Sequence, residues 1–177
     1  RMLQITKGGT ITDINSNIIE NNDFTYANDN SNQNALTHSS VVEVQALPSS
    51  GTGTLNIKNN TLNNNIRRGV RAGSYSYFNG IFVANTTNPQ NQYIENNTIN
   101  GLKLLLATTP STYTILSGIR VKGKITNVTT TINNNTITGL ESNGVKTALT
   151  VANARTGLDY NTFSMRGIIV DAVKRAD

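Results

Sequence analysis

The sequence predicts an all-β protein built as a parallel β-helix, in which the chain winds through about five stacked coils. Two repeated motifs carry this prediction, and both return at intervals of about 37 to 39 residues over most of the chain. Self-similarity at such a period is typical of proteins whose structural units stack on one another. A single unit has too little apolar surface to fold alone, so stability must come from contact between neighbouring coils.

The first motif consists of an apolar residue, a polar residue, two asparagines, another polar residue and a second apolar residue. It occupies residues 19–24, 57–62, 94–99 and 132–137, and a variant with Tyr160 occupies 158–163. Its apolar residues are an odd number of positions apart, whereas alternate residues of a straight strand share a face. The chain must therefore bend at the asparagines, which accept the left-handed backbone region readily. Amides of the second asparagines are predicted to form a ladder up the stack: Asn22, Asn60, Asn97, Asn135 and Asn161.

The second motif is a pair of apolar residues separated by one residue, usually introduced by glycine or another small residue. It occurs at residues 3 and 5, 42 and 44, 81 and 83, 119 and 121, 149 and 151, and 168 and 170. Alternation of this kind predicts strands with one face toward a core. These positions predict coils that shorten from about 39 to about 19 residues toward the C-terminal end.

Long segments separate the first motif from the next strand in the first three coils. They cover residues 25–40, 63–79 and 100–117. Because they leave each coil at the same point, we expect them to emerge as long loops on one side of the stack. The leucines at 104–106 predict that the last segment packs back as an extra strand.

Composition narrows the class of protein. The net charge is +5 with a pI near 9.6, and the basic residues are dispersed, so we expect no nucleic-acid partner. There is no cysteine to form disulfides or ligate a metal. No apolar run approaches the roughly 20 residues that a membrane-spanning helix requires. We expect residues 1–177 to form one domain, and we expect a longer protein around it because Leu3 and Ile5 already belong to the repeat.

The recurring Ile-x-Asn-Asn-x-Ile and Gly-Ile-x-Val elements resemble those of the pectin-lyase-like superfamily of right-handed parallel β-helices. The resemblance is carried by residues 57–62, 94–99 and 132–137 and by residues 80–83 and 118–121. It is strongest with repeat-rich bacterial surface proteins. It implies a right-handed solenoid, whereas the activity stays open because the superfamily contains lyases, hydrolases, phage tailspikes and adhesins without catalytic activity.

Two groups of residues are candidate contacts for a glycan or another subunit. The outward row of the Gly-Ile-x-Val strands places Phe82 between Glu43 and Arg120, with Lys122 in the next row, and such a set could stack on and hydrogen-bond a sugar. The same row could instead be solvated, or covered by a neighbouring chain or loop. The second group lies in one predicted loop, where a solvated surface is the alternative: Arg67, Arg68, Arg71, Tyr75 and Tyr77.

A pair of acids was also considered as catalytic machinery. The predicted alignment puts Glu20 and Glu95 two coils apart, about 9.6 Å from twice the strand spacing, which borders the separation of the carboxylates in inverting glycosidases. Lys58 falls between them, so an ordinary ion-pair ladder on the surface is favoured. We therefore assign no catalytic, cofactor-binding or metal-binding residues.

These observations favour a non-enzymatic segment of an extracellular bacterial or phage protein. It would act as a rigid stalk or adhesive surface toward polysaccharides or cell-surface glycans. A polysaccharide lyase or glycoside hydrolase working on the face around Glu43, Phe82, Arg120 and Lys122 is the first alternative. A section of a phage tailspike, in which three copies associate along their sides, is the second.

Overall fold

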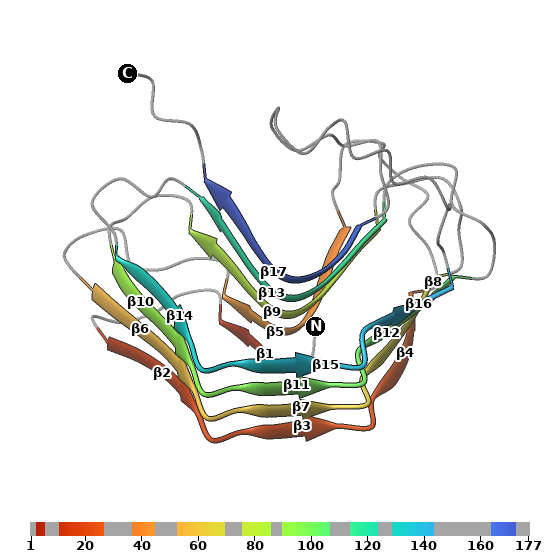
Figure 1. Ribbon diagram of the computed structural model, residues 1–177, viewed down its shortest axis with the longest axis horizontal. Helices are drawn as coiled ribbons and strands as arrows, with labels where there is room; N and C mark the ends of the chain where they lie inside the picture. Colours follow the sequence, from red (N-terminus) through yellow and green to blue (C-terminus); the bar gives the residue numbers. More distant parts are fainter. Residues whose placement is uncertain are drawn as a thin grey trace.

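The protein is a parallel β-helix. A computed structural model describes residues 3–5, 11–26, 37–44, 53–69, 76–85, 90–106, 114–123, 129–143 and 164–172. Every regular element in these ranges is a strand, and the strands form four parallel sheets, here named A to D in the order in which a coil passes through them. Figure 1 shows sheets B, C and D as three sides around the core, with sheet A closing the fourth side.

Each sheet collects the equivalent strands of successive coils. Sheet A contains β1 (Leu3–Ile5), β5 (Thr37–Val44), β9 (Ser76–Asn85), β13 (Thr114–Gly123) and β17 (Ser164–Ala172). Sheet B contains β2 (Ile11–Asn15), β6 (Gly53–Lys58), β10 (Gln90–Glu95) and β14 (Thr130–Asn133). Sheet C contains β3 (Ile18–Glu20), β7 (Thr61–Asn63), β11 (Thr98–Asn100) and β15 (Thr136–Thr138). Sheet D contains β4 (Asp23–Tyr26), β8 (Ile66–Gly69), β12 (Lys103–Leu106) and β16 (Glu141–Ser142).

One aliphatic core runs through the stack, because equivalent residues of successive coils pair in register. Ile14, Ile57, Ile94 and Ile132 form one row in sheet B. Sheet C supplies a second row: Ile19, Leu62, Ile99 and Ile137. Residues of all four sheets belong to the same buried cluster. Burial of such rows stabilises the fold by about 25 cal/mol for each Å² of apolar surface removed from water. The stacking of coils is therefore the main source of stability.

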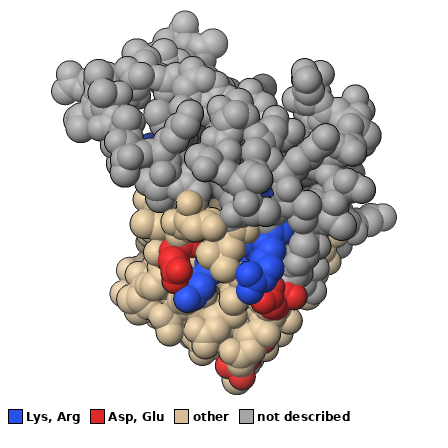
Figure 2. Space-filling view, turned by 90° about the vertical axis from the view of Figure 1, so that its right-hand side faces the viewer, with Lys and Arg blue, Asp and Glu red and all other residues tan. Residues whose placement is uncertain are grey.

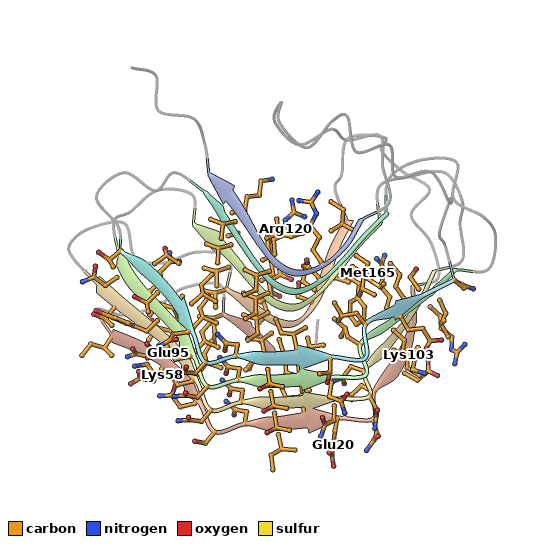
Figure 3. The ribbon with its side chains drawn as sticks, viewed as in Figure 1. Glu20, Lys58, Glu95, Lys103, Arg120 and Met165 are labelled. Carbon is orange, nitrogen blue, oxygen red and sulfur yellow. The ribbon has the colours of Figure 1, made fainter. Side chains whose placement is uncertain are left out.

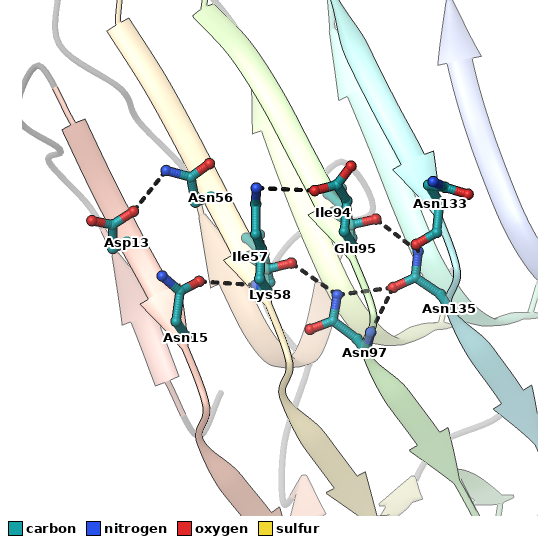
Figure 4. Close-up of polar contacts among 10 residues, drawn as sticks. All are labelled: Asp13, Asn15, Asn56, Ile57, Lys58, Ile94, Glu95, Asn97, Asn133 and Asn135. Atoms are coloured by element: carbon teal, nitrogen blue, oxygen red, sulfur yellow. Dashed lines mark hydrogen bonds and ion pairs between the residues drawn. The ribbon is translucent and has the colours of Figure 1, made fainter.

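The first corner of each coil joins sheets B and C, and it contains the predicted asparagine ladder. The residue that makes the turn has a positive φ of 57° at Ser16, 58° at Asn59, 56° at Asn96 and 52° at Asn134. The following asparagine points into the stack. Asn97 Nδ2 donates to Asn135 Oδ1 at 2.9 Å, and Asn60 Nδ2 donates to Asn97 Oδ1 at 2.9 Å. Figure 4 shows the contact between Asn97 and Asn135, which links coils three and four.

The second corner joins sheets C and D, and the prediction missed it. Its turn residues are Asn21, Asn64, Gly101 and Gly139, all with positive φ. Residues 19–24 make this corner, so the prediction that Asn22 continues the ladder of Asn60 is wrong. Asn22 Nδ2 instead donates to Asn65 Oδ1 at 2.9 Å, and Asn17 is the first member of the main ladder. Residues 158–163, which include Asn161, lie outside the described residues.

Sheet A bends in the middle of each long strand. Phe78 and Ile81 both belong to the core cluster although they are an odd number of residues apart, so the strand direction changes between them. Gly118 lies at the equivalent bend of β13, where an added Cβ would stand 2.6 Å from Ile137 Cγ2 and 2.8 Å from the Gly167 carbonyl oxygen. No larger side chain fits there without movement. The bends give sheet A the V shape seen in Figure 1.

The predicted shortening of the coils is wrong. Strand β13 pairs directly with β17, so Ile119 neighbours Ile168 and the pair at 149 and 151 forms no row between them. Ile81 precedes Ile119 by 38 residues, whereas Ile119 precedes Ile168 by 49 residues. The last described coil is therefore longer than the ones before it, because an insertion between strands does not disturb the pairing of the strands.

The predicted one-sided loops contain more strand than expected. Ile66–Gly69 forms β8, which pairs with β12, and β12 is the extra strand predicted from the leucines at 104–106. Residues 76–79 and 114–117 extend β9 and β13 toward their N-terminal ends. The coil consequently has four sides and two asparagine-containing corners.

Candidate functional site

The outward row predicted on sheet A forms in the expected register. Glu43 pairs with Phe82, Phe82 with Arg120, and Arg120 with Ile169 on successive coils. The guanidinium carbon of Arg120 lies 5.9 Å from the centroid of the Phe82 ring, within the range of a cation–π interaction. Figure 3 shows Arg120 inside the mouth of the V formed by sheet A.

These side chains are buried, which agrees with a covered row rather than with an open binding surface or a solvated one. Glu43 is 0 % exposed, and Phe82 and Arg120 are each 3 % exposed. A strand face that borders solvent would leave such long side chains largely accessible. A ligand can therefore reach this part of the row only if the covering atoms move.

A second outward row on sheet A is polar, and the sequence motifs gave no indication of it. Asn79 and Ser117 each follow a core residue, Phe78 and Leu116, so they point to the opposite face of the strand. Ser117 Oγ donates to Asn79 Oδ1 at 2.7 Å, and Asn79 Nδ2 contacts Ser40 Oγ at 3.4 Å. A small polar residue just before the glycine of Gly-Ile-x-Val is the signal that could have identified this row.

The accessible part of the outer face lies toward the C-terminal coils and is basic. Lys122 is half-buried and Arg166 is exposed. Arg166 pairs with Ser117 in the polar row, and Lys122 lies two residues beyond Arg120 on β13. Glu43 stands two coils from Arg120, about 9.6 Å away at the usual strand spacing. Among the described side chains of this face, the acid Glu43 thus lies apart from the bases Arg120, Lys122 and Arg166.

The arginine and tyrosine cluster predicted in one loop lies only partly within the described residues. Arg67 and Arg68 are neighbours in β8 and point to opposite faces, because side chains alternate along a strand. Arg67 is 2 % exposed and faces inward, so the prediction that it lies on a contact surface is wrong. Arg71 and Tyr75 lie outside the described residues, and Tyr77 is described only as a backbone position of β9.

Arg68 faces outward and pairs with Asp23 of the preceding coil. Its Nη2 and Nε donate to the Asp23 carboxylate at 2.8 Å each, a two-point contact. These hydrogen bonds lower the pKa of Asp23 from its ordinary value and raise the pKa of Arg68. Figure 2 shows this side of the molecule, with acidic and basic side chains in contact over sheet D. Lys103 and Glu141 make the second such pair at 2.7 Å.

The acids considered as catalytic machinery lie on three different sheets. Glu20 is in β3 of sheet C, Glu43 in β5 of sheet A, and Glu95 in β10 of sheet B. Glu20 pairs with Asn63 rather than with Lys58, so the predicted alignment of Glu20 with Glu95 is wrong. Figure 3 shows Glu20 and Glu95 on separate sides of the stack.

Glu95 instead belongs to an ion-pair ladder on sheet B. Lys58 Nζ lies 2.9 Å from Glu95 Oε2 and 5.0 Å from the centroid of the Tyr93 ring. Asn56 Nδ2 donates to Asp13 Oδ1 at 2.7 Å in the neighbouring row. Figure 4 shows the Lys58–Glu95 ion pair and the Asn56–Asp13 hydrogen bond. Each crosses from one coil to the next, and the ion pair is the one that the ladder interpretation predicts.

The part of the chain that the structure describes shows neither a cluster of metal ligands nor a membrane-spanning helix. Within it, no three His, Asp or Glu side chains come together as metal ligands. No helix with the length and apolar character needed to cross a membrane occurs within the same ranges. Comparison of the chain with protein-family models, with curated proteins and with solved structures gave no match.

Proposed function

We propose that the chain is a rigid β-helical segment of an extracellular surface protein, and that it supports adhesion rather than catalysis. The observation that carries this proposal is the continuity of the stack: four parallel sheets and an asparagine ladder connect coils one to four, and sheet A continues to β17 of the fifth coil. The resemblance to the pectin-lyase-like β-helices, and to bacterial surface repeats among them, supports the same assignment.

Rigidity follows from the number of connections between coils. From coil one to coil four, the backbone of each coil bonds to the next in sheets A, B, C and D, and the ladder adds buried side-chain bonds at the first corner. Separating two coils therefore requires the simultaneous loss of contacts on all sides, as nearest-neighbour coupling in a solenoid implies. Such a body holds whatever it carries at a fixed distance and orientation.

A glycan contact on the outer face of sheet A is the binding activity that the geometry favours. Lys122 and Arg166 offer exposed or half-exposed cationic donors beside the polar row of Asn79 and Ser117. Cationic groups of this kind can hydrogen-bond sugar hydroxyls and carboxylates, whereas Asn79 and Ser117 are themselves buried and support the strand beneath. Arg120 over Phe82 fixes the position of the basic end of the face.

Binding without product release separates this proposal from the enzymatic alternative. The purified chain is applied to a panel of neutral and acidic polysaccharides, and retention is measured together with new reducing ends and unsaturated ends. We expect retention without either product. Release of product that disappears in Arg120→Ala would overturn the proposal in favour of a lyase or hydrolase.

Matched charge changes locate the contact. Lys122→Gln and Arg166→Gln each remove one positive charge from the outer face of sheet A, and both should weaken retention. Lys103→Gln removes the same charge from sheet D and should leave retention unchanged. Equal effects of all three variants would mean that net charge, rather than a site on sheet A, drives binding.

The tailspike alternative predicts three copies in solution. Sedimentation equilibrium of the full chain measures the assembled mass directly. A monomer agrees with the stalk or adhesive segment, and a stable trimer would favour the tailspike interpretation.

A further inference from the structure

The first corner contains a three-residue sequence, and only its middle residue is committed to the asparagine ladder. In coils two, three and four it reads Asn-Asn-Thr, at residues 59–61, 96–98 and 134–136. The first asparagine makes the turn and the second forms the ladder. The threonine begins β7, β11 or β15 and is more exposed on coils three and four.

The turn asparagines present their side chains to solvent. Asn59, Asn96 and Asn134 are all exposed, with φ between 52° and 58°. Within the described part of the chain their amides take no part in the hydrogen bonds that hold the ladder together. Asn60 and Asn97 are the opposite case, since both are 0 % exposed. Each corner thus combines one asparagine committed to the core with one that is accessible.

An accessible asparagine followed two residues later by threonine is the acceptor sequence for N-linked glycosylation. We propose that Asn59, Asn96 and Asn134 are N-glycosylation sites, modified in a row along the first corner of the β-helix. The donor is a sugar activated by a diphosphate leaving group. A bond forms between the asparagine amide nitrogen and the anomeric carbon, the bond from that carbon to the phosphate oxygen breaks, the diphosphate leaves with the electron pair, and the amide proton passes to a base of the transferase.

The chain contains matched corners that lack the acceptor sequence. The first corner of coil one has Ser16, Asn17 and Ile18, with the same backbone turn and no threonine. Asn64 makes the second corner of coil two with φ 50° and is exposed, but Ile66 stands two residues after it. Both corners share the turn geometry and lack a threonine two residues after the turn residue, and coil one also has serine in place of the acceptor asparagine, so both should stay unmodified. Asn85 and Asn127 also begin Asn-x-Thr sequences, which extend outside the described residues.

Peptide mass spectrometry of the protein purified from the organism that produces it tests the proposal. We expect peptides containing Asn59, Asn96 or Asn134 to carry hexose or N-acetylhexosamine, and the peptide containing Asn64 to carry none at that residue. Unmodified masses for all three corner peptides would overturn the proposal. Attachment of the sugar to Thr61, Thr98 or Thr136 would overturn it equally.

Variants at coil three separate the acceptor role from a structural one. Asn96→Gly keeps a residue that adopts positive φ easily and removes the amide, so the chain should fold and lose sugar at this corner only. Thr98→Val should abolish modification at Asn96, whereas Thr98→Ser should retain it. Thermal unfolding of each variant checks the fold, and sugar that remains on this corner in folded Asn96→Gly contradicts the proposal. The result does not depend on whether sheet A binds a glycan.

Discussion

The asparagine ladder should be a large and local source of stability, and Asn97→Ala removes one of its central members. Asn97 is 0 % exposed and stands in the middle of the stack. Its Oδ1 accepts from the Asn60 backbone N–H at 3.0 Å and from Asn60 Nδ2 at 2.9 Å. Its Nδ2 donates to the Ile57 carbonyl at 2.8 Å and to Asn135 Oδ1 at 2.9 Å. Alanine removes all four bonds at once.

The expected loss follows from those four bonds. An intramolecular hydrogen bond contributes about 0.5–1.5 kcal/mol net, and a buried group left without a partner costs about 1–3 kcal/mol. The Asn60 N–H and the Ile57 carbonyl each lose a partner inside the protein, where water cannot easily replace it. We therefore expect the free energy of unfolding to fall by about 2–6 kcal/mol. That is a large part of the roughly 5–15 kcal/mol that stabilises an ordinary domain.

Equilibrium denaturation in urea measures this loss, and Asn96→Gly is the matched control. Asn96 precedes Asn97, is exposed, and adopts φ 56°, a conformation that glycine accepts without strain. The control should change stability by less than about 0.5–1 kcal/mol. If Asn97→Ala costs no more than Asn96→Gly, the ladder does not stabilise the stack and the reasoning is refuted.

Three further predictions concern the bend of sheet A and the surface ion pairs. Gly118→Ala should cost about 1–3 kcal/mol by overpacking against Ile137, whereas Gly167→Ala, whose nearest neighbour is 3.9 Å away, should be tolerated; equal melting temperatures would contradict this. A double-mutant cycle on Lys58 and Glu95 should give a coupling of about 0–1 kcal/mol, because the pair is partly solvated; a coupling well above that range would be unexpected. NMR titration should find the pKa of Asp23 below the ordinary value of an aspartate, so its stabilising contact is fully present above that ordinary value and is lost as pH falls through the lowered pKa. Arg68→Ala should return that pKa toward the ordinary value, and an unchanged pKa would show that Arg68 is not its cause.

Periodicity predicted the parts of the fold in which neighbouring coils have the same sequence pattern. The rows of sheet A through Val42, Ile81 and Ile119, and the corner at Asn59 and Asn96, follow directly from apolar spacing and asparagine chemistry. The first coil was misaligned because its first corner uses Ser16 where later coils use asparagine. Its second corner, at Asn21 and Asn22, then imitates the motif, since both corners need a residue with positive φ.

The candidate site was less predictable because it depends on packing rather than on sequence spacing. The sequence predicts the register of Glu43, Phe82 and Arg120, but their burial depends on what packs over the outer face of sheet A, which alternation alone does not reveal. Arg67 was placed in a loop because an arginine pair gives no apolar alternation. Only its pairing with Leu104 in the next coil makes it an inward-facing strand residue.

The register between the first two coils tests the central claim most directly. The chain has no cysteine, so a disulfide between two introduced cysteines can be detected without competition from native thiols. The structure pairs Asn15 with Lys58 and places Glu20 beside Asn63. Paired residues on adjacent strands lie about 4.8 Å apart, within the range that a disulfide can bridge. We predict that Asn15→Cys with Lys58→Cys oxidises to a disulfide in the folded protein and that Glu20→Cys with Lys58→Cys does not. The reverse outcome would show that the coils stack in the uniform register of the motif, and would contradict the two-corner β-helix.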